Sequence, residues 1–299
     1  MNKLPQHKRE LIIRCLVEGM SIRATARVAD VSKNTIAKLL NDAGKACAAY
    51  HDDHVRGIKG KRRIECDEIW SFCYAKEKMV PRAKKAPKEA GDVWTWTAID
   101  ADSKLMLSYL VSGERDSTNA LEFMDDLRQR LQDRPQITTD GLKAYIEAVE
   151  ESFGADVDYA QVIKEYAKMG GGCEQERKYS PSVCTKIEKR KVQGEPDMAA
   201  AGTSIVERQN LTMRMGIRRF TRLTNAFSKR IDKHAAAAAL HVMYYKFSRL
   251  HQTLKITPSM AAVLTHRVLE ISDIVKLIDE SLPKPGPRGP YKKRNAISN

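Results

Sequence analysis

The feature that most constrains this chain is the run Ile64–Tyr74, in which three carboxylates stand among apolar and aromatic residues. Residues of that kind at that density predict a buried or half-buried strand. The ionised side chains of Glu65, Asp67 and Glu68 are costly in such a strand unless a cation or a network of hydrogen bonds compensates them. The fold must therefore supply either an internal partner or a bound metal at this strand.

The length of 299 residues leaves room for one sizeable domain with a small one beside it, or for two of middling size. No segment approaches the roughly 18 uninterrupted apolar residues that a membrane span needs. Met1–Arg9 lacks the apolar core of a signal peptide, so we expect a cytoplasmic protein without a membrane partner. The six cysteines show neither a C-x-x-C metal pair nor a compact disulfide framework, and we expect most of them to be reduced and buried.

The net charge of +14 is distributed unevenly. Residues 1–64 hold 14 Lys and Arg against 6 Asp and Glu, residues 208–255 hold 11 against 1, and residues 283–299 hold 5 against none. Segregated basic surface is typical of proteins that bind a polyanion such as DNA, because each neutralised phosphate releases counterions. A basic surface kept for solubility is the alternative that charge alone leaves open.

The N-terminal residues predict a helix-turn-helix domain over residues 1–56, followed by a basic linker at 57–63. Helices are expected over 8–18, from the N-cap Ser21 to Val28, and over 33–42 behind the N-cap Ser32. The start of the last of these would enter the major groove of DNA, where short polar and basic side chains contact base edges and phosphates. A three-helix packing unit that does not bind DNA fits the same pattern. The candidate DNA contacts are Lys33, Asn34, Thr35 and Lys38.

The rest of the chain predicts an α/β domain over residues 64–282. Strands are expected over 64–74, 92–101, 104–112, 136–141 and 157–163, with helices over 117–131 and 142–153. The non-periodic stretch 164–203 contains glycines and prolines and is expected to be an inserted loop or subdomain. Helices resume over 204–220, 232–250, 258–265 and 268–281, and the basic tail 283–299 is expected to be disordered.

Three carboxylates occupy positions that chemistry explains more economically than structure does. Asp67 lies in the middle of the first strand, Asp140 ends a short strand before a glycine, and Glu207 stands in the first turn of a helix. In a sheet whose first strand neighbours the fourth, Asp67 and Asp140 come close together, and a helix packed across them can deliver Glu207. Convergent carboxylates suit Mg²⁺, or Mn²⁺ in its place. Two such ions about 3.5–4 Å apart would clamp the attacking and leaving oxygens of a phosphodiester.

Each of these acids also has a structural interpretation. Asp67 can pair with a buried arginine, and Glu65 or Glu68 can be the ligand in its place. An aspartate before a glycine, as at Asp140, is a common turn former. The spacing from Ser204 to Glu207 matches a capping box, which needs no catalytic role. Spacing alone leaves these alternatives open.

Five strings carry a resemblance to a known family. They are Asp67–Trp70, Trp94–Asp100, Thr139–Tyr145, Val206–Asn210 and Ser248–Leu254. Together they resemble the DDE transposases of bacterial insertion sequences, and the first-numbered insertion-sequence family in particular, over roughly residues 20–265. The resemblance implies a ribonuclease-H-like mixed sheet flanked by helices, preceded by the small all-α helix-turn-helix domain. It also implies metal-dependent cleavage and joining of DNA ends.

Residue by residue, the resemblance makes Asp67, Asp140 and Glu207 the metal ligands. Asn210 and Arg214 follow Glu207 at helical spacing and become candidates for positioning near the site. Because both ends of a mobile element must be joined, a homo-oligomer is expected on DNA. The basic residues expected to contact the DNA phosphates on this side are Arg214, Arg218, Arg219, Arg222, Lys229 and Arg230.

The sequence departs from the family in two places. The zinc-binding cysteine cluster that the family often carries ahead of its helix-turn-helix has no counterpart here, and the stretch between Asp140 and Glu207 is long. Two other functional classes stay open. One is a helix-turn-helix transcription regulator without catalysis, and the other is a structure-specific nuclease of the same fold that cuts DNA without joining it.

Overall fold

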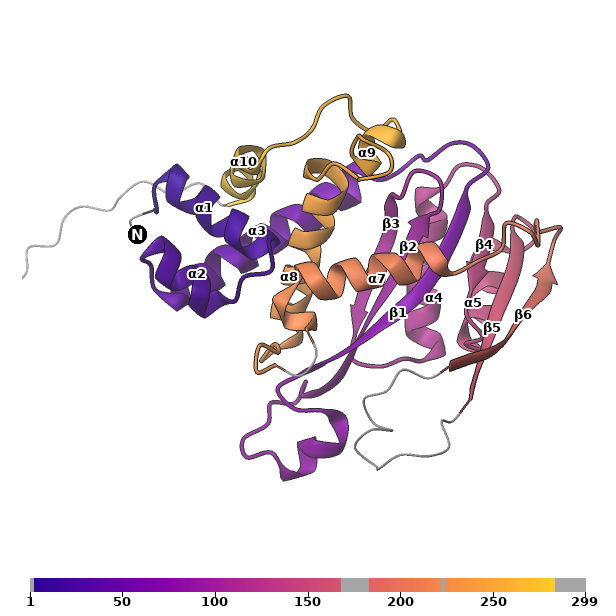
Figure 1. The fold of residues 1–299 in the computed structure, drawn as a ribbon, viewed down its shortest axis with the longest axis horizontal. Coiled ribbons are helices and arrows are strands. Elements are labelled where there is room, and N and C mark those ends of the chain that lie inside the picture. The colour runs from indigo at the N-terminus through magenta and orange to yellow at the C-terminus, as the bar shows by residue number, and fades with distance from the viewer. Residues whose placement is uncertain (1–2, 168–182, 222–223, 283–299) are drawn as a thin grey trace, which may run out of the picture.

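A six-stranded mixed sheet forms the centre of the protein, seen in a computed structural model that describes residues 3–167, 183–221 and 224–282. The strands lie in the order β3-β2-β1-β4-β5-β6 (Figure 1). Their bounds are β1 Arg63–Cys73, β2 Gly91–Asp100, β3 Met106–Ser112, β4 Gln136–Thr139, β5 Asp158–Ala167 and β6 Val183–Gln193.

The strand directions follow the connections between the strands. β1, β2 and β3 form an antiparallel meander through short turns and the loop that holds the 3₁₀ helix η1, Glu77–Arg82. β4 and β5 follow helical crossovers and are parallel to β1, whereas β6 returns antiparallel to β5. The α/β class and the mixed sheet flanked by helices are therefore confirmed, with the first predicted strand at the centre of the sheet.

The helices cover both faces of the sheet (Figure 1). α4, Ser117–Arg130, and α5, Ala144–Phe153, lie on one face, where the buried ring of Trp96 contacts Phe123 and Tyr145. α7, Ser204–Gly216, crosses the opposite face over β1 and β2. Alternate side chains of β1 therefore enter two different layers, which decides below where each of its acids points.

Three helices form the N-terminal part: α1, Gln6–Val17, α2, Ile22–Ala29, and α3, Lys33–His54. Both predicted N-caps are confirmed, because Ser21 Oγ accepts from Ala24 N–H at 3.1 Å and Ser32 Oγ accepts from Asn34 N–H at 3.2 Å. The expected end of the third helix near residue 42 was wrong, since α3 continues to His54. No proline follows residue 42 before His54, and the one glycine there, Gly44, is tolerated for a packing reason.

Gly44 is where α3 crosses α8, Ile231–Met243. A Cβ atom at Gly44 would lie 2.4 Å from the Cα of Ala236, so only glycine allows this approach. The alanine run of α8 presents an equally small surface, and buried residues of both helices join one hydrophobic core with those of the sheet. Ile58, within the expected linker, is buried and its N–H donates to the Arg130 carbonyl at 2.9 Å. The division into domains stays a prediction.

Residues 164–203 contain more regular structure than their composition predicts. β5 extends to Ala167, and β6 pairs with it from Tyr159–Gln193 to Ala167–Val183. Most side chains of β6 are exposed, so the strand shows no alternation of apolar and polar residues that sequence analysis can detect. Residues 168–182 and the tail 283–299 lie outside the described residues, and the expected disorder of that tail is untested.

The C-terminal helices complete the core beside α3. α8 continues as a π-helical turn, η3 Tyr244–Ser248, and α9, Pro258–Ala261, follows. α10, Ile271–Ser281, packs against α1 and α3. The helix expected over 204–220 ends at Gly216 and is followed by a 3₁₀ turn, η2 Arg218–Phe220. Within the described residues, no helix combines the length and the apolar character needed to cross a membrane.

Candidate metal centre

Glu65, the first acid of β1, holds the start of α7. Its Oε2 accepts from the backbone N–H of Ile205 at 2.7 Å and of Val206 at 2.9 Å. These are N–H groups that the first turn of a helix leaves unpaired, and the positive end of the helix dipole favours a carboxylate there. Burial raises the pKa of Glu65, while the two N–H donors act against that rise. The carboxylate of Glu65 in β1 therefore caps the N-terminus of α7 and fixes this helix over β1.

Asp67 points to the same face, two residues further along the strand. Asn210 of α7 donates from Nδ2 to Asp67 Oδ2 at 2.7 Å. The Thr97 hydroxyl lies 3.1 Å from both Asn210 Oδ1 and the Asp67 carbonyl oxygen, which orients the amide. Burial raises the pKa of Asp67 to about 6, and the charge of Asp140 adds to the rise. Asp67 thus has a neutral hydrogen-bond partner, and it forms no ion pair within the part of the chain that the structure describes.

Asp140 reaches Asp67 because β1 and β4 are neighbouring parallel strands. Their register pairs Glu65 with Thr138, and two further residues along each strand bring Asp67 level with Asp140. Oδ1 of Asp140 accepts from Leu142 N–H at 3.0 Å, so the residue also shapes the turn after β4. Its side chain stays 38% exposed, which leaves the carboxylate accessible. The turn-forming interpretation and a ligand role are therefore compatible.

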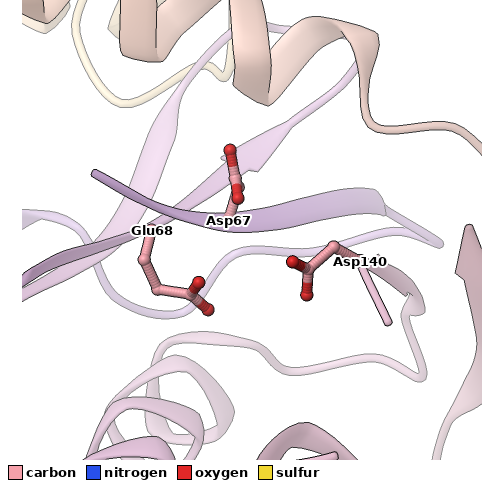
Figure 2. A group of neighbouring side chains, drawn as sticks. All are labelled: Asp67, Glu68 and Asp140. Atoms are coloured by element: carbon pink, nitrogen blue, oxygen red, sulfur yellow. The ribbon is translucent and has the colours of Figure 1, made fainter. Parts of the chain in front are cut away.

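Glu68 completes a group of three carboxylates, which we call the acidic cluster: Asp67, Glu68 and Asp140. One oxygen of each lies within 4.8 Å of the others. Figure 2 shows Asp67 and Glu68 leaving β1 on opposite sides, with Asp140 across from both. Burial raises the pKa of Glu68 to about 7, and the charge of Asp140 adds to this. Arg115 donates to Glu68 Oε2 at 2.8 Å, while Glu68 Oε1 is buried with no hydrogen-bond partner among the described residues.

Glu207 does not belong to the acidic cluster. Its Oε1 pairs with Lys164 Nζ of β5 and accepts from the Thr203 hydroxyl at 2.7 Å. The helix begins behind Thr203 without a side-chain cap, so the capping box suggested by Ser204 does not form. Glu207 is close enough for its charge to raise the pKa of Asp67. Lys164 thus holds the third predicted ligand beside the cluster rather than in it.

The donor set fits a divalent cation. The carboxylates at this end of the sheet outnumber their ion-pair partners, because Arg115 pairs with Glu68 and Asp140 and Lys164 pairs with Glu207. A surplus of negative charge in a partly buried place is costly without a further cation. Oxygen donors from carboxylates are the ligands that Mg²⁺ and Mn²⁺ prefer. The buried Glu68 Oε1 makes no hydrogen bond of good geometry among the described residues, although the Tyr145 hydroxyl lies close enough to lower the pKa of Glu68.

The helix-turn-helix candidates lie at the start of α3 as expected. Lys33 and Asn34 are exposed, and Thr35 is half-buried. Lys38 forms an ion pair with Asp42 one turn later, at 2.6 Å between Nζ and Oδ2. The positions are therefore accessible, and their contact with DNA stays a prediction.

The basic candidates after Glu207 are placed differently from one another. Arg218 is exposed, and Arg214 donates to the Trp70 carbonyl at 3.3 Å, beside the strand that carries Asp67. Arg219 turns inward, donating to Ser228 Oγ at 3.0 Å and to the Lys233 carbonyl at 3.1 Å, an arrangement that stabilises the loop before α8. Arg222 lies outside the described residues.

Sequence reasoning missed the two cations at this site. Arg115 follows β3 in a loop with no periodic pattern, and Lys164 stands on a strand whose end is exposed. It considered Glu68 only as a ligand in place of Asp67, although the position of Glu68 in β1 was a signal: a second acid next to Asp67 in an otherwise apolar strand needs a partner of its own.

Comparisons with known proteins add little to this geometry. A scan against protein-family models and a search among curated proteins each found no match. Among solved structures, the Mos1 transposase paired-end complex with left transposon end matches at 12% identity with a TM-score of 0.23, over 53% of this chain and 60% of that one. The Mos1 strand transfer complex matches at 14% identity and a TM-score of 0.22, over 52% and 59% of the two chains. At these values the likeness carries no argument about activity.

Proposed function

We propose that this protein is a DNA transposase that cleaves the ends of a mobile element and transfers the freed 3′-hydroxyl to target DNA with the help of divalent metal. The observation that carries the proposal is the acidic cluster, where carboxylates from two neighbouring parallel strands converge with too few cations. Bound Mg²⁺ or Mn²⁺, two ions in our proposal, would activate the attacking oxygen and stabilise the leaving oxygen of a phosphodiester. Asp67, Asp140 and Glu207 are the proposed ligands.

The chain's own residues prepare this site. Asn210 and Thr97 fix the carboxylate of Asp67, and Glu65 fixes the helix that carries Asn210. Arg115 restrains Glu68 and lies 3.5 Å from Asp140 Oδ2. For Glu207 to act as a ligand, its carboxylate has to exchange Lys164 for the metal. The metal would then replace the Lys164 ammonium group as the positive partner of the Glu207 carboxylate.

DNA binding is proposed for two surfaces. The start of α3 carries the exposed Lys33 and Asn34, which suit contacts in a major groove. The exposed Arg218 and the basic segment 208–255 would bind phosphates near the catalytic end of the sheet. A homo-oligomer on DNA is part of the proposal, because two element ends have to be held together.

The test is a cleavage and strand-transfer assay on the DNA flanking the gene, with and without Mg²⁺ or Mn²⁺. Asp67→Asn and Asp140→Asn are expected to lower cleavage by roughly a thousandfold or more while leaving DNA binding intact. Glu207→Gln is expected to do the same if its carboxylate becomes a ligand. Glu122, an exposed acid of α4, is a control, and Glu122→Gln should cleave normally.

Three outcomes would replace the proposal. Binding without metal-dependent nicking assigns the protein to the transcription regulators. Cleavage without joining assigns it to the structure-specific nucleases. Full activity in Asp67→Asn removes the acidic cluster from the reaction.

A further inference from the structure

A cavity of about 510 Å³ lies along α7 on the side away from Glu207. Ile205, Arg208, Gln209 and Thr212 line it from the helix. At 100° per residue, these positions share one face of α7, whereas Glu207 lies on the opposite face. One helix therefore separates the acidic end of the sheet from a second, differently charged site.

The polar rim of this cavity is cationic. Lys104, Arg208 and Arg249 line it, and no Asp or Glu does. None of the three forms an ion pair with any side chain in the part of the chain that the structure describes. His251, also in the wall, has its pKa lowered by burial and then by the charges of Lys104 and Arg249. Lys104 Nζ donates to the Ala101 carbonyl, which leaves Arg208 and Arg249 as the lining cations that can receive an anion.

The inner wall is apolar and aromatic and includes the buried amide of Gln209, whereas the second amide of the lining, Gln252, is exposed. Ile99, Ile205 and Tyr245 line it, and Tyr245 is 5% exposed. Gln209 is 3% exposed, and its Nε2 is buried without a hydrogen-bond partner among the described residues. A buried amide left unpaired is costly, so a ligand that accepts from it gains affinity. Apolar and aromatic side chains beside a buried amide are suited to a nucleobase.

The turn that carries Lys104 is strained. Lys104 has φ +60°, the left-handed region that glycine or asparagine usually occupies, in the tight connection from β2 to β3. The Tyr245 hydroxyl donates to the Lys104 carbonyl at 3.2 Å and so ties this turn to the aromatic wall. Strain of this kind is concentrated at ligand sites.

We infer, on the basis of the proposed function, that this cavity binds one unpaired nucleotide of the DNA strand processed at the acidic cluster. Arg208 and Arg249 bind its phosphate, Tyr245 and the isoleucines contact its base, and Gln209 donates to the base edge. A cavity of this volume has the size of a small-ligand pocket and cannot admit a base that is still paired in a duplex. The inference also gives a role to Ser248–Leu254. This segment is one of the five that carry the family resemblance, and it contributes no residue to the acidic cluster.

Binding is measured on the full chain without metal, so that no catalytic step contributes. The probe is a single-stranded oligonucleotide with 2-aminopurine at one position, whose fluorescence rises when that base leaves the stack, and its duplex is the second probe. Arg249→Ala and Gln209→Leu are expected to weaken binding of the single strand about tenfold and to reduce the fluorescence rise. Lys276→Ala, which removes one exposed charge on α10, is the matched control and should change neither.

Each alternative result has a definite meaning. Equal weakening of single strand and duplex by Arg249→Ala, with Gln209→Leu binding normally, reduces the cavity to a backbone contact and overturns the inference. Displacement of the probe by thymidine monophosphate at comparable concentration assigns the cavity to a free nucleotide instead of a strand and also overturns it. Because Arg249 is exposed, its variant should fold, and an unchanged Tm confirms this. Loss of binding in these variants together with absent cleavage by the wild type would leave the cavity standing and the proposed function refuted.

Discussion

Two groups of ionisable side chains are removed from water in this protein, and they respond in opposite ways. In the acidic cluster, burial raises the pKa of Asp67 to about 6 and of Glu68 to about 7. Between α3 and η3, Lys246 is fully buried against His51, and burial lowers the pKa of both well below their ordinary values. Desolvation disfavours the charged form in each case.

The difference lies in what each group can do about its charge. Burial favours the neutral forms of Lys246 and His51, and the two side chains share a hydrogen bond between Lys246 Nζ and His51 Nδ1, while His51 Nε2 is buried without a partner among the described residues. The carboxylates of the acidic cluster compete for one arginine, and Asp140 is open to solvent. An accessible site with surplus charge can bind a cation, whereas a sealed neutral pair only contributes to packing. Four experiments test this contrast.

The largest effect on the free energy of unfolding is expected for a buried side chain that keeps its charge, the guanidinium of Arg130. Arg130 is 4% exposed and binds Asp126 of its own helix, Asp52 of α3 and the Val55 carbonyl. Arg130→Met removes the cation from the part-buried Asp126 carboxylate and the donor from the Val55 carbonyl, and should lower the free energy of unfolding by about 3 kcal/mol. Urea denaturation measures it. Arg128→Met, at a half-exposed arginine of the same helix, should cost less than about 1 kcal/mol, and equal losses in both variants would contradict the contrast.

The acidic cluster should be stabilised by metal. At a hundredfold excess over Kd, a bound ion contributes about 2.7 kcal/mol, which corresponds to a rise in Tm of roughly 5–10 °C. Thermal unfolding with Mg²⁺ or Mn²⁺, reversed by a chelator, measures the shift. Asp140→Asn should lose most of it and Lys246→Met should keep it. An undiminished shift in Asp140→Asn would place the ion elsewhere.

The sealed lysine should make stability depend on pH. A base whose pKa falls on folding binds fewer protons in the folded state, so the free energy of unfolding rises with pH between the lowered value and 10.5, the ordinary pKa of lysine. The slope is about 1.4 kcal/mol per pH unit for one proton. Lys246→Met should lose this dependence on pH. Its free energy of unfolding should therefore exceed that of the wild type most near neutral pH. Unfolding curves across this pH range measure the slope. The control Lys276→Met should keep it. A slope that persists in Lys246→Met would contradict its assignment to Lys246.

The smallest effect concerns the ion pair between Lys164 and Glu207. The Glu207 side chain is 47% exposed, so Lys164→Met should change the free energy of unfolding by less than about 0.5 kcal/mol. Metal affinity should rise a few fold, since a competing cation has been removed and Glu207 is released. The metal-induced shift in Tm reports this. Lys186→Met breaks a comparable pair with Glu188 on β6 and should leave metal affinity unchanged, so an equal gain there would contradict a specific role for Lys164.

Local signals in the sequence predicted the local structure well. The caps at Ser21 and Ser32 form as expected, because a side-chain oxygen next to a free N–H needs only neighbours in the chain. The proximity of Asp67 and Asp140 followed from the strand order, which the pattern of three strands, helix and strand favours. β6 escaped prediction because its exposed side chains carry no periodic signal.

By itself, the sequence determined that acids would stand in the apolar strand β1 and that strands and helices would follow one another in an α/β domain, because hydrophobic periodicity acts over short distances. The mixed sheet flanked by helices was implied by the family resemblance. Only the tertiary structure decided the partner of each acid. Glu65 caps α7, Asp67 binds Asn210, and Glu68 meets Arg115. Successive side chains of a strand enter opposite layers, and the groups waiting there come from segments that no spacing along the chain connects to β1.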